Sequence, residues 1–437
     1  MKRNSPLYVP SRRGVLRGAA ALGGLTAVSG GLGVPRPARA AGATLSGSDL
    51  KYLFVFAGGG WDPTRVFADG FDNAAVDMEV SADRGTAGGI TYIDAPDRPS
   101  VRTFFENYHE QTVIFNGVMV RSIAHEICTM IALTGTTSGL VPDWPAILGG
   151  AAGERYTLPH LVMTGPSFPG DLGEAVVRSG TSGQLDALLS GEISTWSDST
   201  LNSLSSPSQG ILDNYVRRRS LARADGARTA LDRALARAYS ASVEKAVDLK
   251  DLRYVMNFAG ASDLASAGTV ALEALSLGLA RCVSVTYPID FGGEWDTHVN
   301  NDAQQSPLWE GLFSGLLSIF DELASTPGEV GATLADEVVV VVMSEMGRTP
   351  ALNGLSGKDH WPYTSVMVSG PNLDGSRVIG GFDASWYGDL VDPSTGDSAG
   401  SGGVLSAESV GATLLALGDV DPDGYVSGVE PITGALA

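Results

Sequence analysis

The chain of 437 residues has little cysteine and, past its first forty residues, no long apolar run. Its two cysteines, Cys128 and Cys282, are too few for a disulfide framework. Each lies in an apolar neighbourhood, which favours two buried thiols over a bridge. No apolar run approaches the roughly twenty residues of a membrane-spanning helix, so we expect no stable membrane span in the mature protein.

Basic residues are also scarce, with 29 Lys and Arg against 49 Asp and Glu and a net charge of −20. Residues 1–40 hold seven of the basic residues and no acidic ones, so the rest of the chain has 22 against 49, a net charge of −27. Such a surface repels phosphate backbones, and we therefore expect no nucleic-acid partner.

Residues 1–40 have the three parts of an export signal in the expected order. Arg12 and Arg13 precede a mildly apolar stretch over 18–34, and Ala38-Arg39-Ala40 offers a small-x-small cleavage site. The alternative is a basic tail followed by a membrane anchor. The pattern favours a twin-arginine signal peptide over 1–40, the twin-arginine translocase as partner during export, and a periplasmic, cell-surface or secreted protein over 41–437.

Short apolar runs alternate with helical stretches along the mature chain. Strands are expected over 53–56, 112–115, 161–163, 282–287, 338–343 and 365–368, and helices over 125–133, 270–280, 307–324 and 406–417. This alternation predicts an α/β fold with a mostly parallel central sheet flanked by helices and a site at the carboxyl ends of its strands.

Residues 180–265 differ in composition from the rest of the chain, because 214–246 is rich in Arg, Ala and Leu at helical spacing. We interpret them as a helical insertion that forms a cap. The arginines favour a solvated helix face, with a phosphate-binding cluster as the alternative.

The five histidines divide into two groups. His125, His298 and His360 lie beside acidic residues in polar, Gly-rich or strand-terminal segments, whereas His109 and His160 are expected to be structural. Asp62 and Glu345 directly follow apolar strands. Imidazole with carboxylate is the ligand set of zinc, manganese or iron, so the sequence predicts a transition-metal site with one or two ions.

Three motifs carry a resemblance to a known family: Trp295-Asp296-Thr297-His298, Ser344-Glu345-Met346-Gly347-Arg348-Thr349-Pro350 and Asp359-His360-Trp361-Pro362. They resemble the bacterial family called domain of unknown function 1501, whose members are often exported by the twin-arginine route. That family is similar to the alkaline phosphatase and sulfatase superfamily, which implies a metal-bearing sheet of alkaline-phosphatase-like type.

The resemblance also implies roles for individual residues. The implied metal ligands are Asp62, Asp296, His298, Glu345 and His360, with Asp359 either a ligand or the residue that orients His360. His125 stands where those enzymes place their nucleophile, so it would be a ligand, a base or a nucleophile. Arg348 and Arg121 would hold an anion.

The expected activity is hydrolysis of phosphate, sulfate or related esters, with a small anionic ester or an anionic polymer as partner. The alternative is a non-catalytic, exported metal-binding protein that binds an anionic partner, and the histidine in place of a hydroxyl or thiol at position 125 favours it.

The stretch 419–430 carries a separate calcium signal. Asp419, Asp421 and Asp423 occupy loop positions 1, 3 and 5, Tyr425 position 7 and Glu430 position 12 of an EF-hand pattern. Pro431 argues against an exiting helix, and a simple turn is the alternative.

We predict that replacing Arg12 and Arg13 by lysine blocks export, because the translocase reads the arginine pair itself. Cell fractionation with N-terminal sequencing measures this. An exported protein that still begins at Met1 would contradict the cleavage site.

Overall fold

The computed structural model describes residues 45–179, 192–195, 198–203, 206–249, 261–290 and 293–437. The predicted signal peptide lies outside the described residues. Within them, no helix is both long and apolar enough to cross a membrane.

An eight-stranded sheet forms the centre of the described fold, in the order β14-β4-β13-β10-β1-β9-β5-β6. Its strands are β1 (Lys51–Ala57), β4 (Thr112–Met119), β5 (His160–Val162), β6 (Val176–Arg178), β9 (Cys282–Thr286), β10 (Val338–Ser344), β13 (Tyr363–Ser369) and β14 (Arg377–Gly380). Every neighbouring pair is parallel except the two pairs that involve β13, which runs antiparallel to β10 and β4. The predicted α/β class with a mostly parallel sheet is confirmed.

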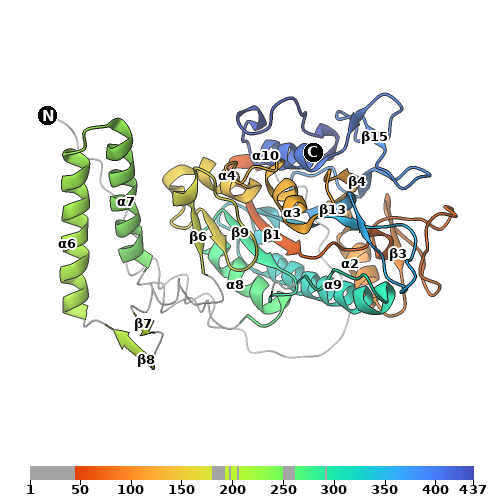
Figure 1. Ribbon diagram of the computed structural model, residues 1–437, viewed down its shortest axis with the longest axis horizontal. Coiled ribbons are helices and arrows are strands. Elements are labelled where there is room, and N and C mark those ends of the chain that lie inside the picture. The colour runs from red at the N-terminus through yellow and green to blue at the C-terminus, as the bar shows by residue number, and fades with distance from the viewer. Residues whose placement is uncertain (1–44, 180–191, 196–197, 204–205, 250–260, 291–292) are drawn as a thin grey trace. The chain divides into compact units, whose positions relative to one another are not determined.

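The two central strands, β1 and β10, are apolar except for Lys51 at the start of β1 and Ser344 at the end of β10, because both faces of the sheet are covered. In β1, Leu53 and Val55 pack into one hydrophobic cluster, while Phe54 and Phe56 pack into the other. The first cluster includes side chains of α2 (Pro99–Tyr108), α8 (Leu264–Ser276) and α9 (Asn301–Ser325). The second includes those of α3 (His125–Thr134), α4 (Trp144–Ala151) and α10 (Ala407–Leu417). Figure 1 shows α8 and α9 along one face and α4 and α10 along the other.

Element boundaries differ most from the expectation in three elements. The strand expected over 112–115 continues to Met119, since β4 pairs with β13 along its whole length. Helix α8 begins at Leu264, because Asp263 and Ser266 form a capping box there. Helix α9 begins at Asn301, so that Pro307 lies inside it.

The predicted helical insertion contains the helices α6 (Ser206–Asp225) and α7 (Ala230–Leu249) and the paired strands β7 (Glu192–Thr195) and β8 (Asp198–Ser203). The rest of 180–265 up to residue 260 lies outside the described residues, and the role of this insertion as a cap stays a prediction. Four short pairs complete the fold: β2 (Asp83–Ala87) with β3 (Ile90–Asp94), β11 (Gly347–Arg348) with β12 (His360–Trp361), and β15 (Leu390–Val391) with β16 (Gly403–Val404), besides β7 with β8.

Both cysteines are buried and free, as predicted. Burial raises the pKa of Cys128 to about 11 and that of Cys282 to about 12, so both remain protonated at neutral pH.

One buried arginine ties the amino-terminal segment to the sheet. Arg281, 2% exposed, donates hydrogen bonds to the carbonyl oxygens of Gly47, Leu50, Leu148 and Gly418. These carbonyls belong to the start of the fold and to the ends of α4 and α10, so one side chain joins three segments distant in sequence.

We predict that Arg281→Met lowers the free energy of unfolding by about 3 kcal/mol or more, because four buried carbonyl oxygens lose their donors. Urea unfolding at neutral pH measures it. The half-exposed Arg102 is the control: Arg102→Met should cost under about 1 kcal/mol. Equal losses in both variants would contradict the role given to Arg281.

Candidate metal centre

The reversed direction of β13 brings one extra segment to the carboxyl edge of the sheet. The loops after β1, β4, β9 and β10 leave the sheet at this edge because those strands are parallel. Residues 359–362 precede β13 and arrive at the same edge because β13 runs the other way. His125, His298 and His360 therefore meet there.

His360 points its Nε2 atom at the carboxylate of Asp296. The distance from Nε2 to Oδ1 is 3.1 Å, and Nδ1 lies 2.7 Å from the carbonyl oxygen of Ile123. A carbonyl oxygen can only accept, so Nδ1 carries a proton, and Nε2 is the ring atom that faces the Asp296 carboxylate.

His298 reaches the same carboxylate oxygen from another side. Its Nδ1 donates to Asp359 Oδ1 at 2.9 Å, which leaves Nε2 to face the centre. This Nε2 lies 3.1 Å from Asp296 Oδ1 and 3.0 Å from the Nε2 of His360. Two ring nitrogens and one carboxylate oxygen thus face a common point.

His125 opens helix α3 and presents a third nitrogen. Its Nδ1 donates to Glu345 Oε1 at 2.9 Å, and Glu345 is fixed in turn by the backbone N–H of Gly59 at 2.7 Å. The Nε2 of His125 lies 3.4 Å from Asp296 Oδ2 and has no hydrogen-bond partner among the described residues, although the atom is buried. The hydrogen bond to Glu345 raises the pKa of His125, with partial burial opposing it.

These side chains fit a transition metal ion. His125, Asp296 and His360 each offer a ligand atom within 4.8 Å of the others, and His298 adds a fourth donor beside two of them. Where the three Nε2 atoms carry no proton, they and the carboxylate repel one another, and a cation between them removes this repulsion. The imidazole and carboxylate donor set is that of zinc and its neighbours.

Arg348 holds Asp296 in place. Its guanidinium is fully buried and donates to Asp296 Oδ1 at 2.6 Å and to the carbonyl oxygens of Gly60, Lys358, Trp295 and Gly59. Burial alone would raise the pKa of Asp296, but Arg348 outweighs it and holds that pKa below its ordinary value. The expected anion-binding role does not fit Arg348, because its N–H groups are directed at the protein.

The loop after β1 approaches the backbone of Asp296 so closely that it requires glycine. Gly59 has φ +121°, and a Cβ atom there would lie 2.7 Å from the backbone nitrogen of Asp296. The Gly58-Gly59-Gly60 sequence lets the loop after β1 pass directly beneath the centre.

Asp62 lies outside the group of converging atoms. Its fully buried carboxylate pairs with Lys358 Nζ at 2.9 Å and Arg65 Nε at 3.3 Å, and it also accepts from Asn301 at 2.9 Å. The ligand role expected for Asp62 does not fit, because these contacts occupy Oδ2 and the N–H and hydroxyl of Thr64 donate to Oδ1. Lys358 stands directly before Asp359 and His360, a signal that the sequence interpretation missed.

Glu345 and Asp359 contact histidines rather than the point of convergence. Each accepts the Nδ1 proton of one imidazole, so they orient His125 and His298. Such carboxylates fix the tautomer of a metal-bound histidine. Glu345 was expected as a ligand, and Asp359 as a ligand or the partner of His360, which uses the Ile123 carbonyl instead.

Arg121 points away from the centre and braces α3. It forms an ion pair with Glu408 of α10 and donates to the carbonyl oxygen of Gly135 at 3.2 Å, directly after the end of α3. Its φ of +55° is unusual for a side-chain-bearing residue. The anion-binding role expected for Arg121 does not fit these contacts, which instead connect β4, α3 and α10.

The two remaining histidines have separate partners. His160 is buried with Nε2 2.8 Å from Ser284 Oγ, and burial lowers its pKa to about 3. His109 contacts Ser376 through Nδ1 at 3.0 Å.

The acidic residues of 419–430 do not gather around a common point. Asp419 accepts from Ser46 Oγ and the Ser48 N–H, and Asp421 caps the turn that contains Asp423. Among the described residues, the group of ligand atoms within 4.8 Å comes from the histidine cluster, with no carboxylate of this stretch. Tyr425 and Glu430 lie at the surface.

A cleft of about 590 Å³ opens beside the centre. His125, Asp296 and Glu345 line it together with Thr129, Met130 and Phe168. His125 and Asp296 therefore lie at the wall of an open cleft.

We predict that Asp62→Asn destabilises the protein without removing metal. Burial alone would raise the pKa of Asp62, but Lys358 and Arg65 lower it to about 2. Because its folded pKa lies below its unfolded value of 3.8, the carboxylate contributes about 2 kcal/mol above pH 4, and this contribution is lost as the pH falls toward 2.

At pH 7 the variant should lose about 3 to 5 kcal/mol, since two buried cations lose their partner, and the difference from wild type should shrink toward pH 2. Denaturant unfolding at several pH values and metal analysis measure both effects. Asp302→Asn is the control, because Asp302 pairs with Arg65 at 2.7 Å but is 40% exposed. A folded Asp62→Asn protein without metal would restore Asp62 as a ligand.

Comparisons with known proteins place the chain in a family. No curated protein matches it. The crystal structure of Ps i-CgsB in complex with k-i-k-neocarrahexaose is similar over 87% of this chain and 74% of that chain, with a TM-score of 0.36 and 9% sequence identity, which is too distant to indicate an activity. The family described as "Protein of unknown function (DUF1501)" matches residues 109–396, a segment that contains His125, Asp296, His298 and His360. The chain therefore belongs to the DUF1501 family, as its motifs predict.

Proposed function

We propose that the protein is an exported, metal-dependent hydrolase of phosphate, sulfate or related esters. One transition metal ion would be held by Asp296, His125, His298 and His360. The observation that carries the proposal is the convergence of three imidazole Nε2 atoms on one carboxylate, with each Nδ1 proton fixed by its own acceptor.

The protein's own groups would keep this site ready for an ion. Glu345, Asp359 and the Ile123 carbonyl hold the Nδ1 protons, and Arg348 orients Asp296. When bound, such an ion polarises an ester oxygen and lowers the pKa of a water molecule. Protonation of the histidines competes with the ion, so its affinity should fall as the pH falls.

The cleft suits an ester with an anionic head and an organic remainder. Met130, Pro166 and Phe168 provide an apolar wall. Helix α3 begins at His125 without a side-chain cap, so its first-turn N–H groups favour an anion beside the ion. The lining contains no lysine or arginine, so the head group would be recognised by the ion and the helix end.

One observation favours the second candidate, a non-catalytic protein that uses the ion for stability or to bind an anionic partner. Among the residues that line the cleft, Thr129 is the one with a hydroxyl group, and it lies one helical turn after His125. The resemblance to phosphatases that the sequence motifs imply would then extend to the site without its nucleophile.

We predict that the protein purified from its native host carries about one transition metal ion per chain, and that Asp296→Asn and His360→Ala lose most of it. Elemental analysis measures the content. His109→Ala is the control, because His109 contacts Ser376 instead of the cluster. Equal metal in all four proteins would contradict the proposed ligand set.

Exchanges at His125 separate the two candidates. An enzyme should lose turnover of a panel of phosphate and sulfate esters in His125→Ala, while its circular dichroism stays unchanged. In His125→Ser, appearance of phosphatase activity would show a competent site whose nucleophile had been exchanged. If wild type is inactive on every ester and His125→Ala loses metal and melts earlier, the non-catalytic candidate is correct.

A further inference from the structure

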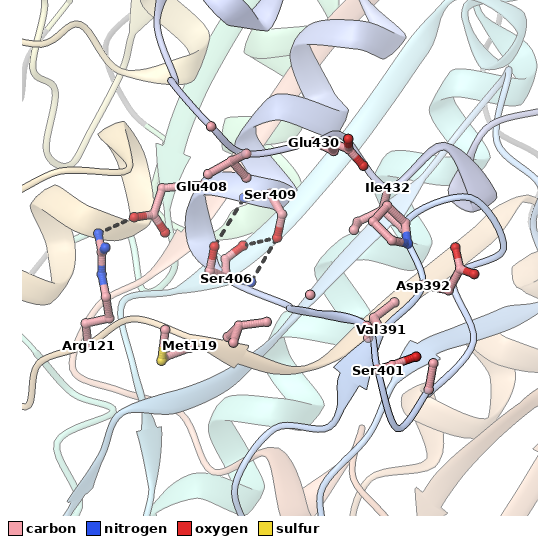
Figure 2. A pocket seen from close by; sticks show the side chains of 17 residues that line it. Met119, Arg121, Val391, Asp392, Ser401, Ser406, Glu408, Ser409, Glu430 and Ile432 are labelled. Atoms are coloured by element: carbon pink, nitrogen blue, oxygen red, sulfur yellow. Dashed lines mark hydrogen bonds and ion pairs between the residues drawn. The ribbon is translucent and has the colours of Figure 1, made fainter.

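A second cavity, of about 700 Å³, lies beside the start of α10 and is distinct from the metal centre. Figure 2 shows that its walls come from the end of β4, the loops around β15 and β16, the start of α10 and the segment near Glu430. Its volume is in the range of small-molecule binding sites.

One carboxylate oxygen in this cavity lacks a partner. The side chain of Glu408 is only 9% exposed, and its Oε1 pairs with Arg121. Its Oε2 is buried and accepts no hydrogen bond from any described residue. Figure 2 shows one oxygen joined to Arg121 and the other directed away from it. A buried charged acceptor left unsatisfied is costly, so this oxygen calls for a donor from the cavity.

The charge of the lining indicates a cationic donor. Asp392 and Glu430 line the cavity with Glu408, whereas Arg121 is its basic residue. Three carboxylates against one guanidinium leave the cavity negative, in a chain whose net charge is −20. These carboxylates are not among the described ligand atoms within 4.8 Å of one another, so spaced N–H donors fit them better than a bare ion.

Apolar side chains between the acids suit an alkyl chain. Met119, Val391 and Ile432 line the same cavity. Methylene groups gain from contact with such walls while an ammonium group at each end reaches a carboxylate.

We propose that this cavity binds an aliphatic amine. One ammonium group donates to Glu408 Oε2, the methylene chain lies against Met119, Val391 and Ile432, and a second cationic group reaches Glu430 or Asp392. A free diamine or polyamine and the lysine side chain of a peptide share this chemistry. This site is independent of the proposed ester hydrolysis.

Isothermal titration of the full mature chain with cadaverine, spermidine and a lysine-containing tripeptide tests the proposal. We expect at least one to bind, with an affinity that falls as salt rises, and pentanol not to bind. Binding of the peptide alone identifies a peptide source, and binding of the diamine or spermidine identifies a free amine. If none binds, the proposal is overturned.

Two substitutions locate the site. Glu408→Gln should weaken binding about tenfold or more, and Glu430→Gln, at an exposed position that tolerates change, should weaken it severalfold. Glu106→Gln, an exposed change on α2, is the control and should bind like wild type. Unchanged binding in Glu430→Gln and in a folded Glu408→Gln protein overturns the proposal, as does displacement of the diamine by an equal concentration of Ca²⁺.

Discussion

The carboxylate of Asp296 organises the side chains at the carboxyl edge of the sheet. Three imidazole nitrogens converge on it, and a buried arginine holds it from behind. Its position is set by backbone, because Arg348 grips the carbonyl oxygens of the loops after β1 and β9 while it contacts Asp296. Charge and geometry are thus fixed together, as preorganised sites require.

Beneath this centre the protein buries a second set of charges that bind each other. Asp62, Lys358 and Arg65 are all fully buried. Their ion pairs offset the free energy of removing these charges from water, because each charge has a close partner of opposite sign. Lys358 directly precedes Asp359 and His360, so the pair with Asp62 anchors the histidine-bearing loop to the loop after β1. The buried network therefore supports the site mechanically, without contributing a ligand.

Helix α3 lies between the cleft at the metal centre and the cavity at Glu408. Its first residue, His125, faces the cleft, and its end is braced by Arg121, which is paired with Glu408 at the edge of the second cavity. A ligand at Glu408 and an ion at His125 would act on opposite ends of one rigid helix. The match to the family covers residues 109–396, which include α3 and β13. It does not include α10, where Glu408 lies.

The sequence by itself determined the fold class and most of the residues that form the site. Uninterrupted apolar strands such as 338–343 exist only where a sheet is covered on both faces, and their regular alternation with helices specified the α/β class. The three motifs identified the family and contain Asp296, His298 and His360, and His125 was singled out by its place in a polar segment beside Glu126.

Tertiary structure alone decided the part that each residue plays. Asp62 and Glu345 both follow strands and look alike in the sequence, yet one is enclosed by Lys358 and Arg65 while the other orients His125. The direction of β13, which brings His360 to the shared edge, depends on pairing between strands far apart in the chain. A carboxylate becomes a ligand, an orienting group or half of an ion pair according to which charged groups the fold places within about 3 Å of it. The local sequence does not specify those distances, because the partners are far apart along the chain.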